Sequence, residues 1–332
     1  MRKPGTVAIL AATLLGSAID TGWAQTQSPV AMKPTRVETE ILKTIVFITV
    51  EASEPGTSGR PVTLRGTGFL VNVPDTRLPK NLVFCYLVTN RHVAEATEQD
   101  ENGNREALQI QGTYVTLNLK EPIDGRRSER VLLSQRAHWY FPKDEASDLA
   151  VLPFAIPAKY DEKEFPLENF LTEESLDQNR VSPGDRVLTV GFYSGYAGLH
   201  AIQPILREGV LAMLPDGPMT TTTGRSGRVY LADVHIIPGN SGSPIFIIPG
   251  LGLGVPASIS GIPNVFGLLG VVSGYMYETS DFSLRASTTW KGSLNANSGI
   301  AVVVPAQQLK DLLNSPELQL QRNQEVNGAA GR

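Results

Sequence analysis

Three side chains of the 332-residue chain together provide the groups that a hydroxyl nucleophile needs: His92, Asp148 and Ser241. A serine hydroxyl attacks poorly at its own pKa, an imidazole accepts its proton near neutral pH, and a buried carboxylate fixes the imidazole tautomer. Each residue alone has an ordinary structural explanation, as a packed histidine, a strand-end aspartate or a turn serine. Their occurrence in three separate motifs favours nucleophilic catalysis.

Ser241 lies in the turn PGNSGSP, residues 238–244, between apolar runs at 229–237 and 245–248. Glycine, asparagine and serine allow backbone conformations that bulkier residues avoid. Such a turn can expose a hydroxyl and aim neighbouring N–H groups at the oxyanion that forms during attack. The turn by itself is equally consistent with a plain β-hairpin. The other two motifs therefore decide for catalysis.

His92 follows the apolar run in LVTNRHV, and Asp148 precedes the apolar run in SDLAVL. Asp144 is a competing carboxylate, but no apolar strand follows it directly. We interpret His138 and His200 as packed or solvated residues, because neither lies in a comparable motif.

Short β-branched runs bounded by Gly, Pro and Ser predict many strands in two sets. The first set comprises residues 45–50, 66–71, 82–89, 114–119, 131–133 and 149–154. The second set comprises residues 187–192, 209–214, 229–237, 245–248, 268–273 and 300–304. Helices are predicted around 173–178 and, with an amphipathic pattern, over 305–313. We expect an all-β fold of two packed antiparallel β-barrels with a C-terminal helix, although periodicity alone also allows a sandwich.

The predicted organisation is a signal peptide, a mobile leader, a first β-barrel with His and Asp, a second β-barrel with Ser and the C-terminal helix, and a disordered tail. Their bounds are 1–24, 25–37, 38–165, 166–313 and 314–332. Two Gly-rich loops, at 217–227 and 249–263, are expected to border a binding cleft or simply to be mobile.

The signal peptide is predicted from a positive start, an apolar run at 7–18 and small residues before a cut after Ala24. A membrane anchor is the alternative, but the run is short for a bilayer span. We expect a bacterial protein that is periplasmic or secreted, with no stable membrane anchor after cleavage.

Composition limits the partners. A formal net charge of −4 without a basic block argues against nucleic acid. Cys85 is the one cysteine, so no intramolecular disulfide can form. It lies in an apolar run and is interpreted as a small buried hydrophobe, with a cysteine nucleophile as the alternative. No cofactor and no metal are expected, and the oligomeric state stays open.

The motifs resemble those of trypsin/chymotrypsin-like serine proteases, specifically the bacterial, disulfide-free branch with the periplasmic heat-shock proteases and glutamyl endopeptidases. TNRHV resembles the histidine motif, DLAVL the aspartate motif and GNSGSP the nucleophile motif. The resemblance implies a chymotrypsin-like fold and a serine endopeptidase acting on protein or peptide substrates. It implies His92 as general base and acid, Asp148 as orienter and Ser241 as nucleophile, with the N–H groups of Gly239 and Ser241 as the oxyanion hole.

The resemblance also implies five substrate-binding residues: His235, Val272, Ser273, Gly274 and Tyr275. Ser273 and its neighbours would pair with the substrate backbone as an added strand. His235 would lie at the base of the specificity pocket, where it cannot pair with a Lys or Arg side chain. Val272 stands where acid-specific members have a histidine, and the Tyr275 ring would narrow the entrance. We therefore expect cleavage after small or medium apolar residues, with Asp233 as the alternative pocket charge.

Two departures from the family pattern limit what carries over. Asn240 stands where digestive members have an aspartate that pairs with a new N-terminus, so activation by N-terminal clipping is not implied. The stretch after Asn314 is short for the peptide-binding PDZ domain of heat-shock members, so their assembly and chaperone function are not expected. The alternatives to a general endopeptidase are an inactive chymotrypsin-like binding protein and a narrow self-processing or esterase-like serine hydrolase.

Overall fold

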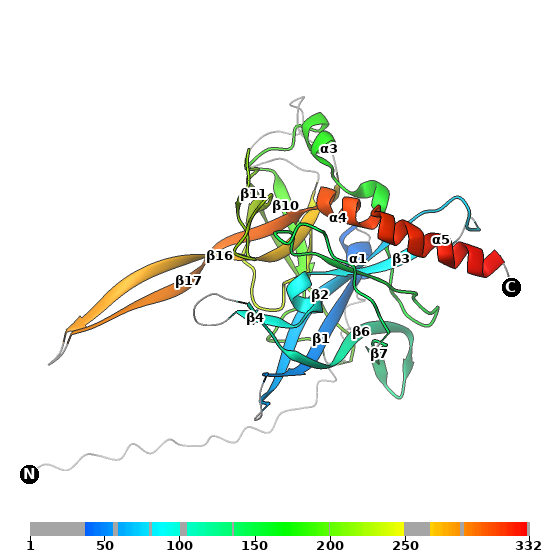
Figure 1. Cartoon of the computed structure of the whole chain (residues 1–332), viewed down its shortest axis with the longest axis horizontal. Helices are drawn as coiled ribbons and strands as arrows, with labels where there is room; N and C mark the ends of the chain where they lie inside the picture. The colour runs from blue at the N-terminus through cyan, green and yellow to red at the C-terminus, as the bar shows by residue number, and fades with distance from the viewer. Residues whose placement is uncertain are drawn as a thin grey trace, which may run out of the picture. The chain divides into compact units, whose positions relative to one another are not determined.

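A computed structural model describes residues 37–55, 59–79, 82–99, 105–134, 136–198, 200–248, 266–285 and 289–330 (Figure 1). These residues belong to one unit of the chain, Arg36–Arg332. The predicted signal peptide, the leader up to residue 36 and the loop at 249–263 lie outside the described residues.

The first half of this unit is a sheet with the strand order β7-β6-β1-β2-β3-β8, and β9 pairs with β2 in parallel. Its strands are β1 Ile45–Ser53, β2 Pro61–Val73, β3 Phe84–Thr89, β6 Gln109–Ile123, β7 Arg126–Leu132, β8 Ala150–Pro153 and β9 Phe165–Pro166. A small hairpin, β4 Thr97–Gln99 with β5 Arg105–Ala107, is separate from it. The hydrogen-bonded path of this half ends at β7 and β8 rather than closing.

The second half is a closed antiparallel barrel, β10-β11-β14-β17-β16-β15. Its strands are β10 Arg186–Gly191, β11 Ile205–Met213, β14 Tyr230–Asp233, β15 Pro244–Ile247, β16 Gly267–Arg285 and β17 Thr289–Pro305. A second small hairpin, β12 Met219–Thr220 with β13 Ser226–Gly227, lies within the connection from β11 to β14. The prediction of an all-β fold with a C-terminal helix is confirmed.

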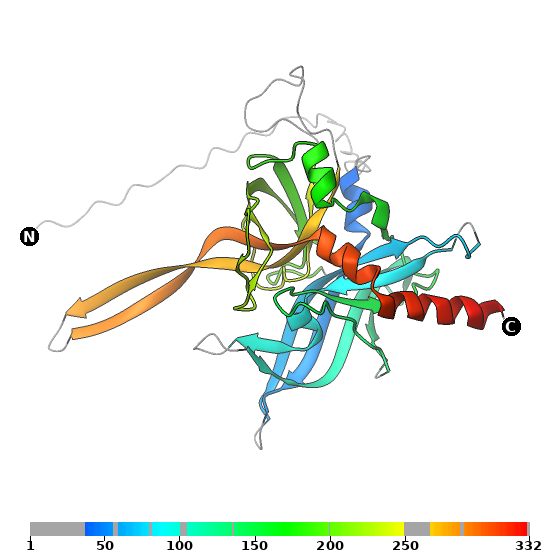
Figure 2. The same cartoon turned by 45° about the horizontal axis from the view of Figure 1, so that its top comes forward.

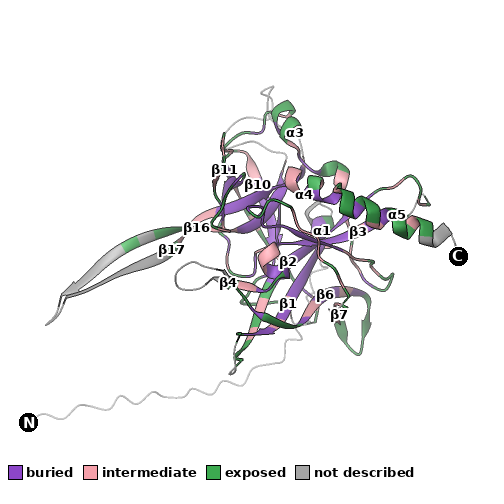
Figure 3. Cartoon of the chain, viewed as in Figure 1, coloured by how far each residue is buried: buried purple, intermediate pink, exposed green. Residues whose placement is uncertain are grey.

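Strand alternation in β1 shows how the two halves share one core. Val46, Ile48 and Val50 belong to an apolar cluster of the first half, whereas Ile45 and Phe47 belong to a cluster that also contains second-half residues. Successive side chains of a strand point to opposite faces, so β1 is buried on both. Phe47 meets Phe192 edge to face, with ring centroids 4.8 Å apart. The central strands β1, β3 and β10 are mostly buried, whereas β7 is largely exposed (Figure 3).

The described helices are short except at the end of the chain. They are α1 Val37–Leu42, α2 Arg91–Ala94, the 3-10 turn η1 Leu167–Asn169, α3 Glu173–Gln178, α4 Ala306–Leu313 and α5 Pro316–Ala330. Thr172 starts α3 with a capping box to Ser175. The helices predicted around 173–178 and over 305–313 are therefore confirmed as α3 and α4.

The prediction of a disordered tail from residue 314 is wrong, because α5 spans Pro316–Ala330. Leu318, Arg322 and Val326 recur every fourth residue, so they share one face of the helix. Leu318 is fully buried, and the buried Arg322 donates hydrogen bonds to Tyr86 Oη at 3.0 Å and to the Leu313 carbonyl at 2.9 Å. Because Arg322 interrupts the apolar residues of this face, the sequence does not show the hydrophobic periodicity of a packed helix.

Strands β16 and β17 are far longer than the predicted segments 268–273 and 300–304. They stay paired as far as Arg285 and Thr289, and this part is a two-stranded ribbon that extends away from the barrel (Figures 1 and 2). Residues 277–299 are rich in Ser, Thr and Asn, so no buried face marks them as strands in the sequence.

Candidate active site

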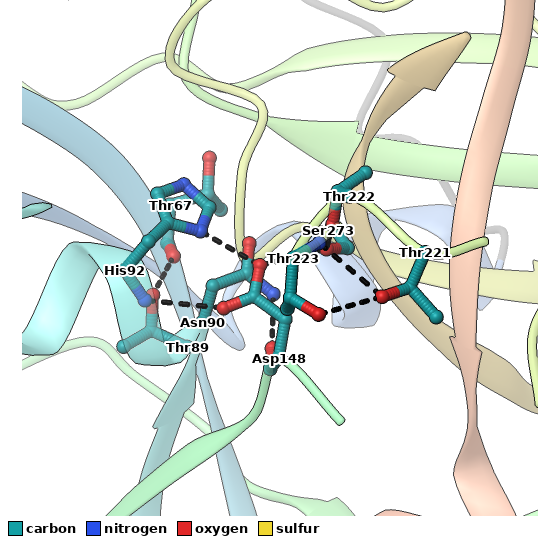
Figure 4. A network of polar contacts seen from close by, with 9 residues as sticks. All are labelled: Thr67, Thr89, Asn90, His92, Asp148, Thr221, Thr222, Thr223 and Ser273. Carbon is teal, nitrogen blue, oxygen red and sulfur yellow. Dashed lines mark hydrogen bonds and ion pairs between the residues drawn. The ribbon is translucent and has the colours of Figure 1, made fainter. Parts of the chain in front are cut away.

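His92 and Asp148 come together because β3 and β8 are antiparallel neighbours, with Thr89 opposite Ala150. His92 lies in α2, directly after β3, and Asp148 lies just before β8. His92 Nδ1 is 2.7 Å from Asp148 Oδ2, and the His92 backbone N–H donates to Asp148 Oδ1 at 3.1 Å (Figure 4). Asn90 Nδ2 donates to the Asp148 carbonyl at 2.8 Å.

Burial differs sharply within this pair. The Asp148 side chain is 1% exposed, whereas the His92 side chain is 20% exposed. An ionised carboxylate only accepts hydrogen bonds, so Nδ1 of His92 carries the proton and Nε2 keeps its lone pair. The imidazole of His92 is therefore partly accessible to a substrate, and the buried Asp148 carboxylate sets its tautomer.

Ser273, at the start of the substrate strand predicted from the sequence, also contacts the carboxylate. Its hydroxyl donates to Asp148 Oδ2 at 2.7 Å, and the residue is buried. The sequence predicts a backbone role for Ser273 in substrate pairing, and the side-chain contact is an additional finding. The sequence around Ser273 does not indicate this hydrogen bond, because the bond joins β16 of the second half to the loop of the first half that carries Asp148.

The turn around Ser241 is held by its own backbone and by Asn240. The N–H groups of Asn240, Gly242 and Ser243 donate to the carbonyls of Ile237, Val272 and Asn240, respectively, at 2.9–3.0 Å. Asn240 Nδ2 also donates to the Phe192 carbonyl at 2.7 Å. Within the described part of the chain, the N–H groups of Gly239 and Ser241 have no hydrogen-bond partner. Two donors of one turn are thus left for an external acceptor.

Gly239 and Gly242 make this turn possible. Their φ angles are +97° and +87°, in the region that favours glycine. A Cβ at Gly239 would lie 2.5 Å from Phe192 Cδ1, and one at Gly242 would lie 2.1 Å from the Thr67 carbonyl oxygen. Any larger residue would therefore displace the serine turn.

Thr67, in β2 of the first half, anchors the turn of the second half. Its N–H donates to the Ser241 carbonyl at 2.8 Å, and its hydroxyl donates to the Gly239 carbonyl at 2.8 Å. The same hydroxyl accepts the Phe192 N–H at 2.8 Å. The neighbouring Gly66 has no room for a Cβ, which would lie 2.8 Å from Val93 Cγ1. Gly66 of β2 therefore lies close to both Val93 of α2 and the Ser241 carbonyl.

This geometry agrees with what the comparisons with known proteins find. Residues 66–250 match the family model of the trypsin-like peptidase domain, and this range includes His92, Asp148 and Ser241. The chain belongs to the trypsin-like peptidase family. The implied fold class, chymotrypsin-like, is confirmed with it. No curated protein matches the chain.

Two solved structures are similar to this trypsin-like peptidase. The crystal structure of Deg5 is 19% identical over 71% of this chain and 81% of that chain, with a TM-score of 0.41. An inactive mutant form of Rv3671c from M. tuberculosis H37Rv is 16% identical over 85% of this chain and 94% of that chain, with a TM-score of 0.42.

The predicted substrate-binding residues of the peptidase lie in two places. Val272 is fully buried, and both its backbone groups are bonded within the protein, to Ser243 and Gly242. Gly274 is half-buried, and so is Tyr275, which packs edge to face on Tyr277 with ring centroids 5.0 Å apart. Burial raises the pKa of Tyr275.

The structure does not bring His235 to the His92–Asp148 pair. His235 and Asp233 are both exposed, whereas the intervening Val234 and the following Ile236 are buried in the core of the closed barrel. The two polar side chains therefore lie on the outward face of this segment. The role of His235 at the base of the pocket stays a prediction.

Three further observations concern metal ligands, membrane spans and the thiol of the described residues. Those residues contain no group of three or more His, Cys, Asp and Glu side chains that could hold a metal ion. None of the described helices is long and apolar enough to cross a membrane. Burial raises the pKa of the Cys85 thiol, which disfavours the thiolate that a cysteine nucleophile needs.

Proposed function

We propose that this trypsin-like peptidase is a serine endopeptidase that uses His92, Asp148 and Ser241. The observation that carries the proposal is the 2.7 Å contact between His92 Nδ1 and the buried Asp148 carboxylate. With Nδ1 protonated, His92 Nε2 can accept a proton. The proposal is further supported by Gly66 of β2, which lies close to both Val93 of the His92 helix and the Ser241 carbonyl.

In the proposed reaction, Ser241 Oγ attacks the carbonyl carbon of the scissile peptide and transfers its proton to His92 Nε2. The carbonyl oxygen becomes an anion, which the N–H groups of Gly239 and Ser241, without a hydrogen-bond partner among the described residues, would stabilise. Collapse of this intermediate breaks the C–N bond, and His92 returns the proton to the leaving amine. Water, deprotonated by His92, then hydrolyses the acyl ester and regenerates Ser241.

Labelling with a fluorophosphonate probe tests the nucleophile, because the probe reacts only with an activated serine. We expect the wild-type protein to carry the label on Ser241 and Ser241→Ala to carry none. Ser243→Ala is the matched control: its buried hydroxyl lies two residues away, without a hydrogen-bond partner among the described residues. It should label like the wild type.

The two rival functions separate in the same set of experiments. An inactive binding protein would not label at all, and label at a different serine would refute the assignment. A narrow esterase-like hydrolase would label but would fail to digest an unfolded protein such as reduced casein. Digestion of casein with new N-termini, lost in Ser241→Ala, supports an endopeptidase.

The proposed location is the periplasm or the exterior of a bacterial cell. It is supported by the charged start, apolar run and small residues of segment 1–24. N-terminal sequencing of the protein from a bacterial periplasmic extract tests it. A mature N-terminus at residue 25 supports export, whereas an intact N-terminus in the cytosolic fraction refutes it.

A further inference from the structure

A hairpin outside the three catalytic motifs reaches the hydrogen bonds of Asp148. It comprises β12 and β13 with the turn between them, and it presents Thr222 to Ser273. The hydroxyl oxygens of Thr222 and Ser273 are hydrogen-bonded, and Ser273 in turn donates to Asp148 Oδ2 at 2.7 Å (Figure 4).

Counting protons gives the direction of these bonds. Ser273 has one hydroxyl proton, and the Asp148 carboxylate can only accept it. Ser273 Oγ must therefore accept from Thr222, which acts as the donor. The chain runs from Thr222 through Ser273 to Asp148, which also accepts from His92 Nδ1. Hydrogen bonds in series polarise one another, so the outer hydroxyl strengthens the inner bond.

The hairpin is fixed to both halves of the unit at this point. Thr221 N–H donates to the Arg225 carbonyl at 2.8 Å and closes the turn. Gly227 packs so closely on Ala146, near Asp148, that a Cβ would lie 2.7 Å from the alanine Cβ. A Cβ at Gly274, after Ser273, would lie 2.9 Å from Thr222 Cγ2. The Thr222 methyl therefore packs against β16, and the Thr222 hydroxyl contacts Ser273 of the same strand.

We propose that Thr222 is a positioning residue of the active site, which holds the Ser273 hydroxyl in the orientation that donates to Asp148. The inference rests on the proposed function, since it concerns the carboxylate that orients His92. Thr222 acts through its hydrogen bond to Ser273, which in turn donates to Asp148. The hairpin thereby becomes part of the catalytic structure, although it lies between β11 and β14 and outside the three motifs.

Loss of the Thr222 hydroxyl has a defined electrostatic consequence. A donor to Asp148 draws negative charge away from the carboxylate, so weakening the Ser273 bond leaves more charge to stabilise a protonated His92. The charged side chain that contacts His92 in the described structure is Asp148. Two charged residues near the pair in sequence have other partners: Arg91 donates to the Pro142 carbonyl, and Glu145 pairs with Arg225. The acid limb of the pH profile of activity should therefore move to higher pH when the hydroxyl is removed.

The test compares Thr222→Val, which keeps the shape and loses the hydroxyl, with Thr222→Ser, which keeps the hydroxyl. Thr220→Val is the matched control, because Thr220 is an exposed threonine of the same hairpin. We expect Thr222→Val to lower kcat about 3- to 10-fold on a peptide substrate, the range of one neutral hydrogen bond, with KM unchanged. The acid limb of the kcat/KM profile should move to higher pH. Thr222→Ser should restore both, and Thr220→Val should match the wild type.

A second readout works without turnover. NMR of the Ser241→Ala protein should show that the His92 Nδ1 proton signal moves when Thr222→Val is added, because this signal reports the hydrogen bond to Asp148. Thr222→Ala gives the same comparison if the valine variant does not fold. An unmoved His92 Nδ1 proton signal, a kcat equal to wild type, or a Thr222→Ser variant as slow as Thr222→Val overturns the inference. A rise in KM alone would also overturn it, as it would make Thr222 a substrate contact. Absence of fluorophosphonate labelling in the wild type refutes the proposed function instead.

Discussion

The hydroxyl of Thr67 donates a 2.8 Å hydrogen bond to the carbonyl of Gly239, across the boundary between the open sheet and the closed barrel. Because the same hydroxyl also accepts the Phe192 N–H, one side chain satisfies two buried backbone groups of the opposite half. The position of the Gly239–Ser241 turn therefore depends on a residue that takes no part in the proposed chemistry.

The first prediction concerns Thr67→Val, which preserves the side-chain shape and removes the hydroxyl. The Gly239 carbonyl and the Phe192 N–H would be buried without a partner, which costs about 1–3 kcal/mol for each such group. We expect a lower urea midpoint and a slower rate of fluorophosphonate labelling at Ser241. Thr67→Ser should retain most of both. Equal stability of the valine variant and the wild type would contradict the anchoring role.

A second prediction concerns pH and Glu162. Burial raises the pKa of Glu162 to about 8, although its Oε1 accepts the Asn118 N–H at 2.5 Å. The folded state thus binds a proton that the unfolded state releases near pH 4.5. Stability from this group is present at low pH and is lost as pH rises from about 4.5 to about 8.

Thermal unfolding of the wild type and Glu162→Gln across pH 5 to 9 checks this sign. The glutamine stays neutral, so the variant should lose less stability than the wild type toward pH 9, by on the order of a few kcal/mol. Parallel stability curves for the two proteins would show that the carboxyl ionises normally.

A third prediction concerns thiol chemistry. Cys85 is the one cysteine of the chain, and burial raises its pKa. Dithiothreitol should leave activity and Tm unchanged, and iodoacetamide should modify Cys85 quickly only after unfolding in urea. Mass spectrometry of the native and unfolded protein measures the modification. Inactivation by dithiothreitol alone would reveal an intermolecular disulfide.

A fourth prediction concerns the terminal helix α5. Leu318 is fully buried, whereas Leu320 on the same helix is 57% exposed. Leu318→Ala should lower the free energy of unfolding by about 2–5 kcal/mol, the usual cost of a buried leucine, and Leu320→Ala should change it little. Equal effects of the two substitutions in urea unfolding would show that α5 does not pack on the unit in solution.

These residues also show which features were predictable from the sequence. His92, Asp148 and Ser241 each lie at the end or start of an apolar strand, so local pattern and turn chemistry indicate them directly. Thr67 and Thr222 act through partners in distant strands, and no local pattern reports such contacts. Arg322 replaces an apolar residue on the packed face of α5, which explains the mistaken prediction of disorder.

The position of His235 in the specificity pocket is also inferred from its spacing to Ser241, and such spacing does not show which way a side chain points. His235 lies six residues before Ser241, but the segment that follows β14 buries Val234 and Ile236 in the core and leaves His235 exposed. The interior of this segment is thus apolar. The charged candidate Asp233 shares the exposed face with His235.

The last prediction is that the peptidase cleaves after small or medium apolar residues such as Ala, Val or Leu. A buried Lys, Arg or Glu side chain needs a paired charge, and the exposed Asp233 stays hydrated rather than buried opposite such a side chain. The Tyr275 ring packs edge to face on Tyr277, and it follows Ser273 and Gly274 in β16, where we propose that it narrows the pocket entrance. Digestion of a peptide library should show these cuts, and Asp233→Asn should leave the cleavage profile unchanged.

Tyr275→Gly should shift the cleavage profile toward larger residues such as Phe, by roughly 10-fold or more per added group that fits. A profile dominated by cuts after Arg or Lys, and abolished in Asp233→Asn, would instead make Asp233 the charge of the pocket.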